Sequence, residues 1–454
     1  MQDLQTEFLR GQQLRREGRL QDALAVFDAL VRRFPKSAAP LERRGMVLCA
    51  LDRFDEGLVD VRAAIGMDPR NAEFRNDLGL MLYILGRKPE ARSEVQRALV
   101  LEPGYKEALI NWCLVLKEEG DFEGVERTAR RLLLAHPGLP QANNHLSNAL
   151  LCLGRFSEAW GPYCERPRPD VSVRDAGVPA VVAHADELPT APSPIVVHGE
   201  QGLGDVIFFL RFAPRLKALG HRLAFWGDAK LQGILAASGL FEHFIARESV
   251  PAAGLTVVWA GDLPKLLGAS DPAAFPPPLR LALDPGRKEA FREQLARLGP
   301  PPYIGLTWRA GLQSRRLVLS KAIDPEALGA ALAGVRATFI SLQRAPLPGE
   351  TERLAAKLGA AVHDASAVNE RLEDAFGLIA LLDDYAGVSN TNTHLRASAG
   401  RGAHVLIPWP PEWRWLRDVE RSPWYPAMTL YRQARDGDWR GALERLASDL
   451  RLAP

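Results

Sequence analysis

The 454-residue sequence has few of the residues that build disulfide or zinc frameworks. It holds only four cysteines, and no two of them form a C-x-x-C pair. We therefore expect neither a disulfide scaffold nor a structural zinc site. HExxH and HxH strings are also absent, and the only D-x-D string, Asp436–Asp438, lies in a loop before the last helix. The sequence thus predicts no metal centre.

Other absences exclude further classes of protein. No run of 18 apolar residues occurs, so we expect no transmembrane segment. The polar first residues lack a signal peptide, and we expect a cytoplasmic protein. Fifty-seven basic residues against 55 acidic ones argue against nucleic acid as the main partner. No GK[ST], GxGxxG or GxSxG motif is present, which argues against P-loop, dinucleotide-binding and serine hydrolase chemistry.

A 34-residue period runs through the first 166 residues. It is visible in five registers, namely Gly18, Asp52, Gly86, Gly120 and Gly154; Pro35, Pro69, Pro103 and Pro137; Gly11, Gly45, Gly79, Cys113 and Ser147; Ala23, Gly57, Ala91, Val125 and Ala159; and Phe27, Val61, Val95, Ala129 and Tyr163. Small residues let two helices approach closely, the glycine or aspartate turns the chain, and proline ends the second helix. The pattern resembles tetratricopeptide repeats and predicts an α superhelix over residues 1–166.

Stacked repeats of this kind form a concave groove, which usually binds a peptide or another protein. Four asparagines fall on first helices of successive repeats, and we name them as candidate acceptor-binding residues: Asn76, Asn111, Asn144 and Asn148. The alternative is that they are solvated positions or local caps. Homodimer formation stays open, because such arrays can dimerise.

After the repeats the sequence changes to an α/β texture. Residues 167–194 are rich in proline and alanine and predict an extended connector. Residues 195–300 and 301–454 each alternate strands with helices, which predicts two Rossmann-like lobes with a cleft between them. We expect the terminal helix GDWRGALERLASDLRL to pack back on the first lobe.

The string GEQGLGD follows the first predicted strand and opens a helix. Gly202 and Gly204 allow close approach of the backbone to an anionic ligand, such as a diphosphate, at the helix N-terminus. Asp205 lies in the first helical turn, where a carboxylate can act as a general base. The alternative is that Asp205 only caps the helix.

A second polar string, GVSNTNTHLRA, also joins a strand to a helix. Its small polar residues can donate several hydrogen bonds to a phosphate. The candidate donor-binding residues here are Asn390, Thr391, Asn392, Thr393 and His394. The alternative is that the asparagines and threonines are helix caps and that the histidine is a packing residue.

Basic residues follow the strand that begins the second lobe. Arg309, Lys321 or the pair Arg315–Arg316 could neutralise a leaving diphosphate, although most such charges are solvated. Downstream, residues 408–426 hold four tryptophans and a tyrosine. This segment predicts either a hydrophobic seam that holds the last helix or an aromatic wall of the acceptor cleft.

The α/β part resembles bacterial tetratricopeptide-linked glycosyltransferases that are related to heptosyltransferases. The strings that carry the resemblance are GEQGLGDVIFFLRFAP, IGLTWRAG, ISLQ, THLRASAG, PPEWRWLRDVERSPWYP and RQARDGDW. The layout, with repeats before two lobes, is also similar to that of O-linked N-acetylglucosamine transferases. Together the resemblance covers nearly the whole chain.

The resemblance implies a metal-independent, inverting GT-B glycosyltransferase. It implies no cofactor, a nucleotide-sugar co-substrate bound between the lobes, and Asp205 as the base that deprotonates an acceptor hydroxyl. The second lobe would hold the nucleotide and diphosphate. The repeats would present a protein acceptor, such as flagellin or another surface protein.

The chain departs from the family pattern at one loop, and two other functions stay open. Relatives usually carry an Asp-Thr-(Ser/Gly) string before the histidine of the second-lobe loop, whereas this chain has Ser389, Asn390 and Thr391. A non-catalytic adaptor with a degenerate transferase domain is therefore an alternative. A heptosyltransferase-like enzyme that acts on a glycolipid is another.

Overall fold

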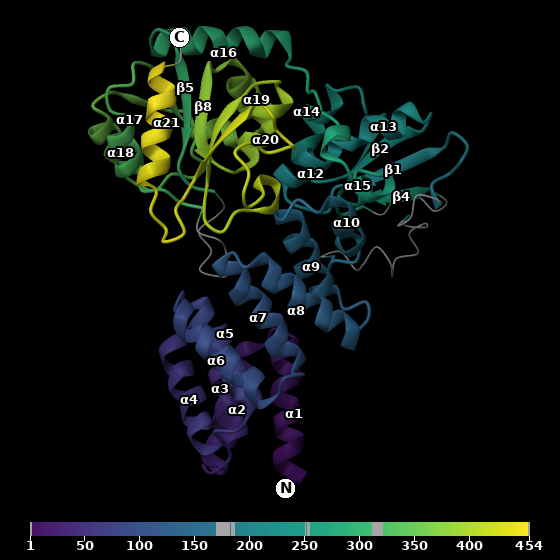
Figure 1. Ribbon diagram of the computed structural model, residues 1–454, viewed down its shortest axis with the longest axis vertical. Coiled ribbons are helices and arrows are strands. Elements are labelled where there is room, and N and C mark those ends of the chain that lie inside the picture. Colours follow the sequence, from purple (N-terminus) through teal and green to yellow (C-terminus); the bar gives the residue numbers. More distant parts are fainter. Residues whose placement is uncertain are drawn as a thin grey trace. The chain divides into compact units, whose positions relative to one another are not determined.

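The computed structural model describes residues 2–168, 182, 187–249, 251, 255–310 and 321–452. The chain divides into two compact units, Met1–His145 and Leu146–Pro454, and each is described by itself. Figure 1 shows the chain coloured along its sequence. In the part of the chain that the structure describes, no helix combines the length and the apolar character needed to cross a bilayer.

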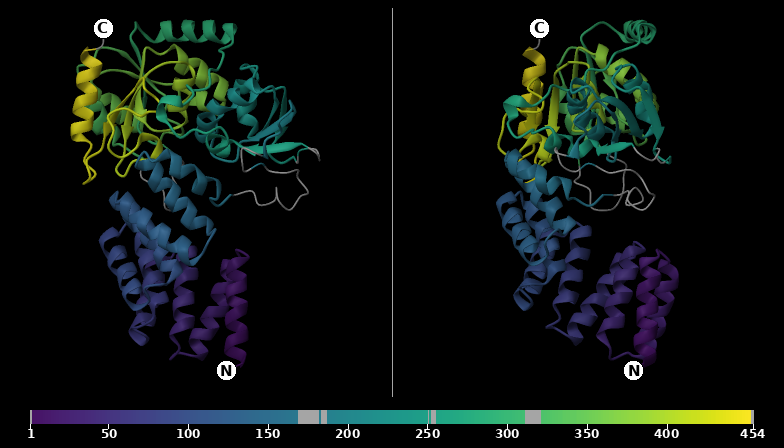
Figure 2. Two further views of the ribbon diagram at one scale, coloured as in Figure 1. Left: turned by 45° about the vertical axis from the view of Figure 1, so that its right-hand side comes forward. Right: turned by 90° about the vertical axis from the view of Figure 1, so that its right-hand side faces the viewer.

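Helical hairpins make up the first unit. Its helices are α1 (Gln2–Arg16), α2 (Leu20–Arg33), α3 (Ala38–Ala50), α4 (Phe54–Met67), α5 (Ala72–Ile84), α6 (Lys88–Leu101), α7 (Lys106–Glu119) and α8 (Phe122–Ala135). Each odd-numbered helix packs against the even-numbered helix that follows it, and the pairs can be followed in both views of Figure 2. Helix α9 (Pro140–Cys152), in which the first unit ends, and helix α10 (Phe156–Cys164) come next along the chain.

The turn inside each hairpin needs a left-handed backbone. Gly18, Gly86, Gly120 and Gly154 have φ between 73° and 76°, and Asp52 has a φ of 63°. Glycine adopts this conformation without steric cost, and aspartate is one of the few other residues that tolerates it. The glycine-or-aspartate register is therefore confirmed as the turn position.

The glycines inside the first helices allow close helix packing. A Cβ atom on Gly45 would lie 2.7 Å from the side chain of Val61, and one on Gly79 would lie 2.6 Å from Val95. Gly11 makes the same kind of contact in the first hairpin. The register of Gly11, Gly45 and Gly79 therefore packs against the register of Phe27, Val61 and Val95, and this helix contact repeats in the first three hairpins.

The first sheet of the second unit has four parallel strands in the order β3-β2-β1-β4. Its strands and helices are β1 (Pro194–His198), α12 (Leu203–Phe209), α13 (Ala213–Ala218), β2 (Arg222–Gly227), α14 (Gln232–Ala236), β3 (His243–Ala246), β4 (Thr256–Trp259) and α15 (Leu263–Leu266). The sequence predicted the alternation of strands and helices except for β3, but it did not predict the order of the strands in the sheet. Within the connector, the Val182 N–H donates to the Val257 carbonyl of edge strand β4 at 3.0 Å.

The second sheet has six parallel strands in the order β10-β9-β8-β5-β6-β7. Its elements are α16 (Pro285–Leu298), β5 (Tyr303–Thr307), α17 (Pro325–Leu332), β6 (Thr338–Ser341), α18 (Glu350–Leu358), β7 (Val362–Asp364), α19 (Leu372–Leu381), β8 (Asp384–Val388), α20 (Thr391–Ser398), β9 (Ala403–Ile407), β10 (Met428–Arg432) and α21 (Arg440–Leu452). Strands β7 and β10 were not predicted; β7 has only three residues, too few for a pattern.

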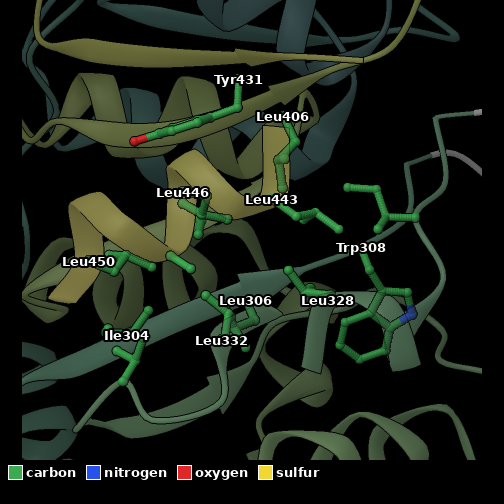
Figure 3. Packing of buried hydrophobic residues seen from close by; sticks show 14 of the residues in the cluster. Ile304, Leu306, Trp308, Leu328, Leu332, Leu406, Tyr431, Leu443, Leu446 and Leu450 are labelled. Atoms are coloured by element: carbon green, nitrogen blue, oxygen red, sulfur yellow. The ribbon is translucent and has the colours of Figure 1, made fainter. Parts of the chain in front are cut away.

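The terminal helix α21 packs on the second sheet, so the prediction that it returns to the first lobe is wrong. Leu443, Leu446 and Leu450 of α21 join the buried cluster that contains Ile304 and Leu306 of β5 (Figure 3). The apolar stripe of α21 is recognisable in the sequence, but the sheet that it covers is not.

Helix α16 also departs from its predicted place. We expected it to end the first lobe, but it packs against α19 of the second sheet. A Cβ atom on Gly377 of α19 would lie 2.7 Å from the ring of Phe291, and Arg287 forms an ion pair with Asp374. The second α/β region therefore begins before residue 300.

We predict opposite effects for two glycine-to-alanine substitutions in the repeats. Both positions are open, since a Cβ atom would have no neighbour within 4 Å, but only Gly86 has a positive φ. Gly86→Ala should lower the free energy of unfolding by about 1 kcal/mol, because alanine is strained there. Gly66→Ala, inside α4, should raise it by roughly 0.5–1 kcal/mol.

Urea denaturation of the full chain, followed by circular dichroism, measures both effects. Equal effects of the two substitutions would contradict the left-handed turn at Gly86.

Candidate functional site

A cavity of about 270 Å³ lies at the carboxyl ends of strands from both sheets of the second unit. Residues that follow β1, β5, β6, β8 and β9 line it. Carboxyl ends of parallel strands are where α/β proteins bind ligands. The lining residues are Gly202, Leu203, Gly204, Asp205, Arg309, Ala310, Lys321, Leu342, Arg344, Asn369, Ser389, Asn390, Thr391, Asn392, His394, Glu412 and Arg414.

Most of the residues that we predicted for donor binding and catalysis meet at this cavity. They are Gly202, Gly204, Asp205, Arg309, Lys321, Asn390, Thr391, Asn392 and His394. Thr393 does not line it, and Arg315 and Arg316 lie outside the described residues. Spacing in the sequence thus located the two turns, although they are almost 190 residues apart.

Close packing of α12 on α20 explains one of the glycines (Figure 1). A Cβ atom on Gly204 would lie 2.9 Å from the imidazole ring of His394. A larger residue at position 204 would therefore push the two turns apart. Gly202, by contrast, is the N-cap of α12, and a Cβ atom there would have room.

Asp205 is held by an arginine that the sequence analysis did not single out. Its carboxylate forms an ion pair with Arg414, whose side chain is 8% exposed, whereas that of Asp205 is 31% exposed. Burial lowers the pKa of Arg414. The Arg414 guanidinium also packs on the ring of Trp413, with its central carbon 4.8 Å from the ring centroid. Asp205 therefore faces the cavity with a fixed cation beside it.

Glu412 links the other polar groups of the cavity. Its carboxylate accepts hydrogen bonds from Lys321 Nζ at 2.6 Å and from Ser389 Oγ at 2.8 Å, and it lies 3.5 Å from Arg414. Lys321, which we predicted to meet a diphosphate, is thus paired with the carboxylate of Glu412. Glu412 and Arg414 are the charged members of the string PPEWRW, which was the one signal in the sequence that could have identified them.

Arg309 is also paired. Its guanidinium bonds to Glu350 at 3.0 Å and to the Ala345 carbonyl at 3.1 Å. Burial alone would raise the pKa of Glu350, but the Leu347 backbone N–H and the Arg309 guanidinium hold it below the usual value. Gln343 accepts hydrogen bonds from the backbone N–H groups of Trp308 and Arg309, which fixes the loop after β5.

The start of α20 is a capping box, so part of the polar string is structural. Asn390 Oδ1 accepts hydrogen bonds from the N–H groups of Asn392 and Thr393, and its Nδ2 donates to Thr307 Oγ1 at 3.1 Å. Thr393 is fully buried and its hydroxyl caps the N–H of Asn390. We therefore assign Thr393 to the helix cap instead of to donor binding.

His394 is an uncharged member of the cavity wall. Burial, with smaller contributions from Arg211 and Lys321, lowers its pKa to about 3. Its Nδ1 lies 2.5 Å from the hydroxyl of Tyr425. At neutral pH the imidazole is therefore neutral, and it can offer hydrogen bonds but no positive charge.

The described lining residues carry more positive than negative charge. Arg309, Lys321, Arg344 and Arg414 stand against Asp205 and Glu412. A cavity of this kind favours the binding of an anion. The anion can replace Asp205 and Glu412 as the partner of the basic side chains.

The aromatic segment 408–426 forms a buried seam, but it does not hold the last helix. Trp413 and Trp424 pack on Trp160 of α10 and on Phe208 of α12, with ring centroids 5.1–6.1 Å apart. We call this group, together with Tyr163 and Phe209, the aromatic seam. None of its described members lines the cavity, so it joins α10 and α12 to the segment that carries Glu412 and Arg414.

The first unit has a separate groove of about 980 Å³. Asn76 and Asn111 line it, and Asn111 Nδ2 donates to Asn76 Oδ1 at 2.8 Å. Asn144 and Asn148 lie on α9 and do not line this groove. Glu42 is a buried carboxylate of α3 that the sequence analysis missed, and burial together with the neighbouring Asp77, which lines the groove, raises its pKa.

The D-x-D string acts as a pair of turn caps. Asp436 Oδ1 accepts from the N–H of Asp438, and Asp438 Oδ1 accepts from the N–H of Arg440. Within the described ranges, no three histidine, cysteine, aspartate or glutamate side chains gather as metal ligands would.

Comparisons with known proteins identify the repeats. Residues 8–61 and 42–106 match a family model described as tetratricopeptide repeat. Protein FlbA of Caulobacter vibrioides is 27% identical over 332 residues, which make up 66% of this chain and 53% of FlbA. The chain thus spans about half the length of this curated relative.

Several solved structures are also similar. PilW, a type IV pilus biogenesis factor, is 21% identical with a TM-score of 0.34, over 40% of this chain and 81% of PilW. PilF of Pseudomonas aeruginosa is 16% identical with a TM-score of 0.36, over 48% of this chain and 86% of PilF. A repeat protein of Thermus thermophilus is 22% identical with a TM-score of 0.34, over 38% of this chain and 96% of that protein. The match to the tetratricopeptide repeat model lies within residues 8–106, part of the segment in which the 34-residue period predicted such repeats.

We predict that the Asp205–Arg414 ion pair contributes measurably to stability. A double-mutant cycle with Asp205→Asn and Arg414→Gln should give a coupling energy of about 1–3 kcal/mol, because the arginine is buried. The exposed pair Arg53–Glu56, with side chains 46% and 59% exposed, serves as the control and should show no measurable coupling.

Chemical denaturation of the full chain measures the coupling energies of the Asp205–Arg414 and Arg53–Glu56 pairs. Equal coupling in the two cycles would contradict the buried ion pair.

Proposed function

We propose that the second unit is a metal-independent glycosyltransferase of the two-lobed GT-B class, which moves a sugar from a nucleotide-sugar to a protein hydroxyl. One observation carries the proposal: the cavity joins the carboxyl ends of strands from two parallel sheets and places Asp205 among basic side chains. The sequence resemblance described above supports the same function. The repeats fit a role in protein interaction and favour a protein acceptor over a glycolipid.

In the proposed reaction, Asp205 takes the proton of the acceptor hydroxyl while that oxygen attacks the anomeric carbon of the sugar. The bond between the anomeric carbon and the diphosphate oxygen breaks, and the anomeric centre inverts. Lys321 and Arg414, which line the cavity, would neutralise the leaving diphosphate, which is the electrostatic contribution that a metal ion would otherwise make.

Two ion pairs of the cavity bear on this mechanism. Arg414 holds Asp205, and Glu412 holds Lys321. A bound diphosphate would compete with both carboxylates for their cations. Binding of the donor diphosphate would then release Asp205 from Arg414 to act as a base.

A second candidate function has its own support. The Asn390 side chain is held by the helix cap through its Oδ1 and by Thr307 through its Nδ2, and no carboxylate is present among residues 389–393. A chain that lost donor binding in this way would serve as a non-catalytic adaptor for proteins.

We predict that one class of nucleotide stabilises the chain. Thermal unfolding should be measured with UDP, GDP, ADP, CMP and TDP and with their common sugar conjugates. The matching nucleotide at about 100 times its Kd should add roughly 2.7 kcal/mol to the free energy of unfolding. Stabilisation by none of them would contradict donor binding and favour the adaptor.

A second assay tests catalysis by measuring how fast the chain hydrolyses the bound nucleotide-sugar, so that the sugar is slowly released to water. Asp205→Asn should keep nucleotide binding but lower this release about 100-fold or more, because the general base is lost. Asp228→Asn is the matched control: this carboxylate follows β2, caps a short helix and does not line the cavity. Full release by the Asp205 variant would remove the proposed base.

A further inference from the structure

The loop that leads to Asp205 has little stiffness of its own. Residues 199–205 include Gly199, Gly202 and Gly204, and glycine loses more conformational freedom on folding than any other residue. Something outside the loop must therefore fix its path if Asp205 is to point into the cavity.

Two polar side chains of this loop are anchored to the end of the repeat segment. Glu200, which is 3% exposed, forms an ion pair with Arg166. Gln201 Nε2 donates to the hydroxyl of Tyr163 at 2.8 Å. Tyr163 belongs to α10, and Arg166 follows two residues after this helix ends.

The arginine joins the loop after β1 to the turn after β4. Its Nη1 donates to Asp262 Oδ1 at 2.8 Å and to the Tyr163 carbonyl at 2.7 Å. Gly261 completes the fit, because a Cβ atom there would lie 2.5 Å from Arg166 Nη2. Arg166, Glu200 and Asp262 are at most 8% exposed, so water cannot replace the bonds between them.

Arg168 provides an internal comparison. Its Nη2 also bonds to Asp262, at 2.7 Å, and to the Cys164 carbonyl at 2.6 Å. Among the described residues, the hydrogen-bond partners of Arg168 are the Cys164 carbonyl and Asp262, and neither belongs to the Gly199–Asp205 loop. The two arginines thus share a carboxylate, but only Arg166 reaches Glu200.

We propose that Arg166 and Tyr163 are positioning residues for the Gly199–Asp205 loop, so that the last helix of the repeat segment is part of the candidate site. This proposal rests on the function proposed above for Asp205. Neither residue lines the cavity, so both act through the loop: Arg166 through Glu200, and Tyr163 through Gln201.

Hydrogen–deuterium exchange of the full chain tests the proposal without requiring activity. Arg166→Gln should speed exchange of the amides of residues 199–206 by about tenfold or more, because the anchor of Glu200 is lost. In Arg166→Lys the exchange rate of these amides should lie between that of Arg166→Gln and that of the unmodified chain, since one ammonium cannot hold both carboxylates in the same geometry. Arg168→Gln is the matched control and should leave exchange in the loop within about twofold.

Tyr163→Phe keeps the proposal falsifiable if Arg166→Gln does not fold. It removes one hydroxyl and should speed loop exchange about two- to fivefold while exchange in α10 stays unchanged. Loop exchange equal to that of the unmodified chain in every folded variant would overturn the proposal. A uniform rise across α10, β1 and the loop would also overturn it, because that result indicates general destabilisation.

Binding of inorganic pyrophosphate, measured by calorimetry on the same variants, separates the two proposals. Affinity that falls at least threefold in Arg166→Gln but not in Arg168→Gln supports positioning. A faster-exchanging loop in a chain whose unmodified form binds no pyrophosphate would support positioning and contradict the proposed donor site. Unchanged affinity and exchange in Arg166→Gln would overturn positioning alone.

Discussion

The aromatic seam is the contact on which the candidate site depends. Trp413 and Trp424 pack edge-on against Phe208 and Trp160, which places α10, α12 and the segment after β9 around one buried core. Large aromatic surfaces in this geometry are among the strongest packing contacts in proteins. Because Arg414 is next to Trp413 and Asp205 lies in the first turn of α12, packing of these rings brings the two charges together.

Local features of the candidate site and the repeats could be predicted from the sequence. The 34-residue period located the hairpins, because three of its five registers have a direct steric cause, namely the left-handed turn, as at Asp52, and the two sides of the contact that joins Gly79 to Val95. The strings after β1 and β8 predicted polar turns, and parallel strands bring such turns to one edge. Nine of the predicted donor and catalytic residues therefore line one cavity.

Contacts between segments that are far apart in the sequence could not be predicted from local sequence patterns. No spacing rule connects Arg414 with Asp205 or Arg166 with Glu200, since each pair is joined only by tertiary packing. The same limit explains why α21 was assigned to the wrong sheet. Conversely, Thr393 fits a phosphate loop in the sequence, but the same hydroxyl satisfies a helix cap in the structure.

The most direct test of the account is a crystal structure of the full chain with the nucleoside diphosphate that it binds. The account predicts diphosphate oxygens within hydrogen-bond distance of Lys321 and Arg414, and an Asp205 carboxylate that no longer contacts Arg414. A nucleotide bound elsewhere, or one bound in the cavity with the Asp205–Arg414 and Lys321–Glu412 pairs intact, would contradict it.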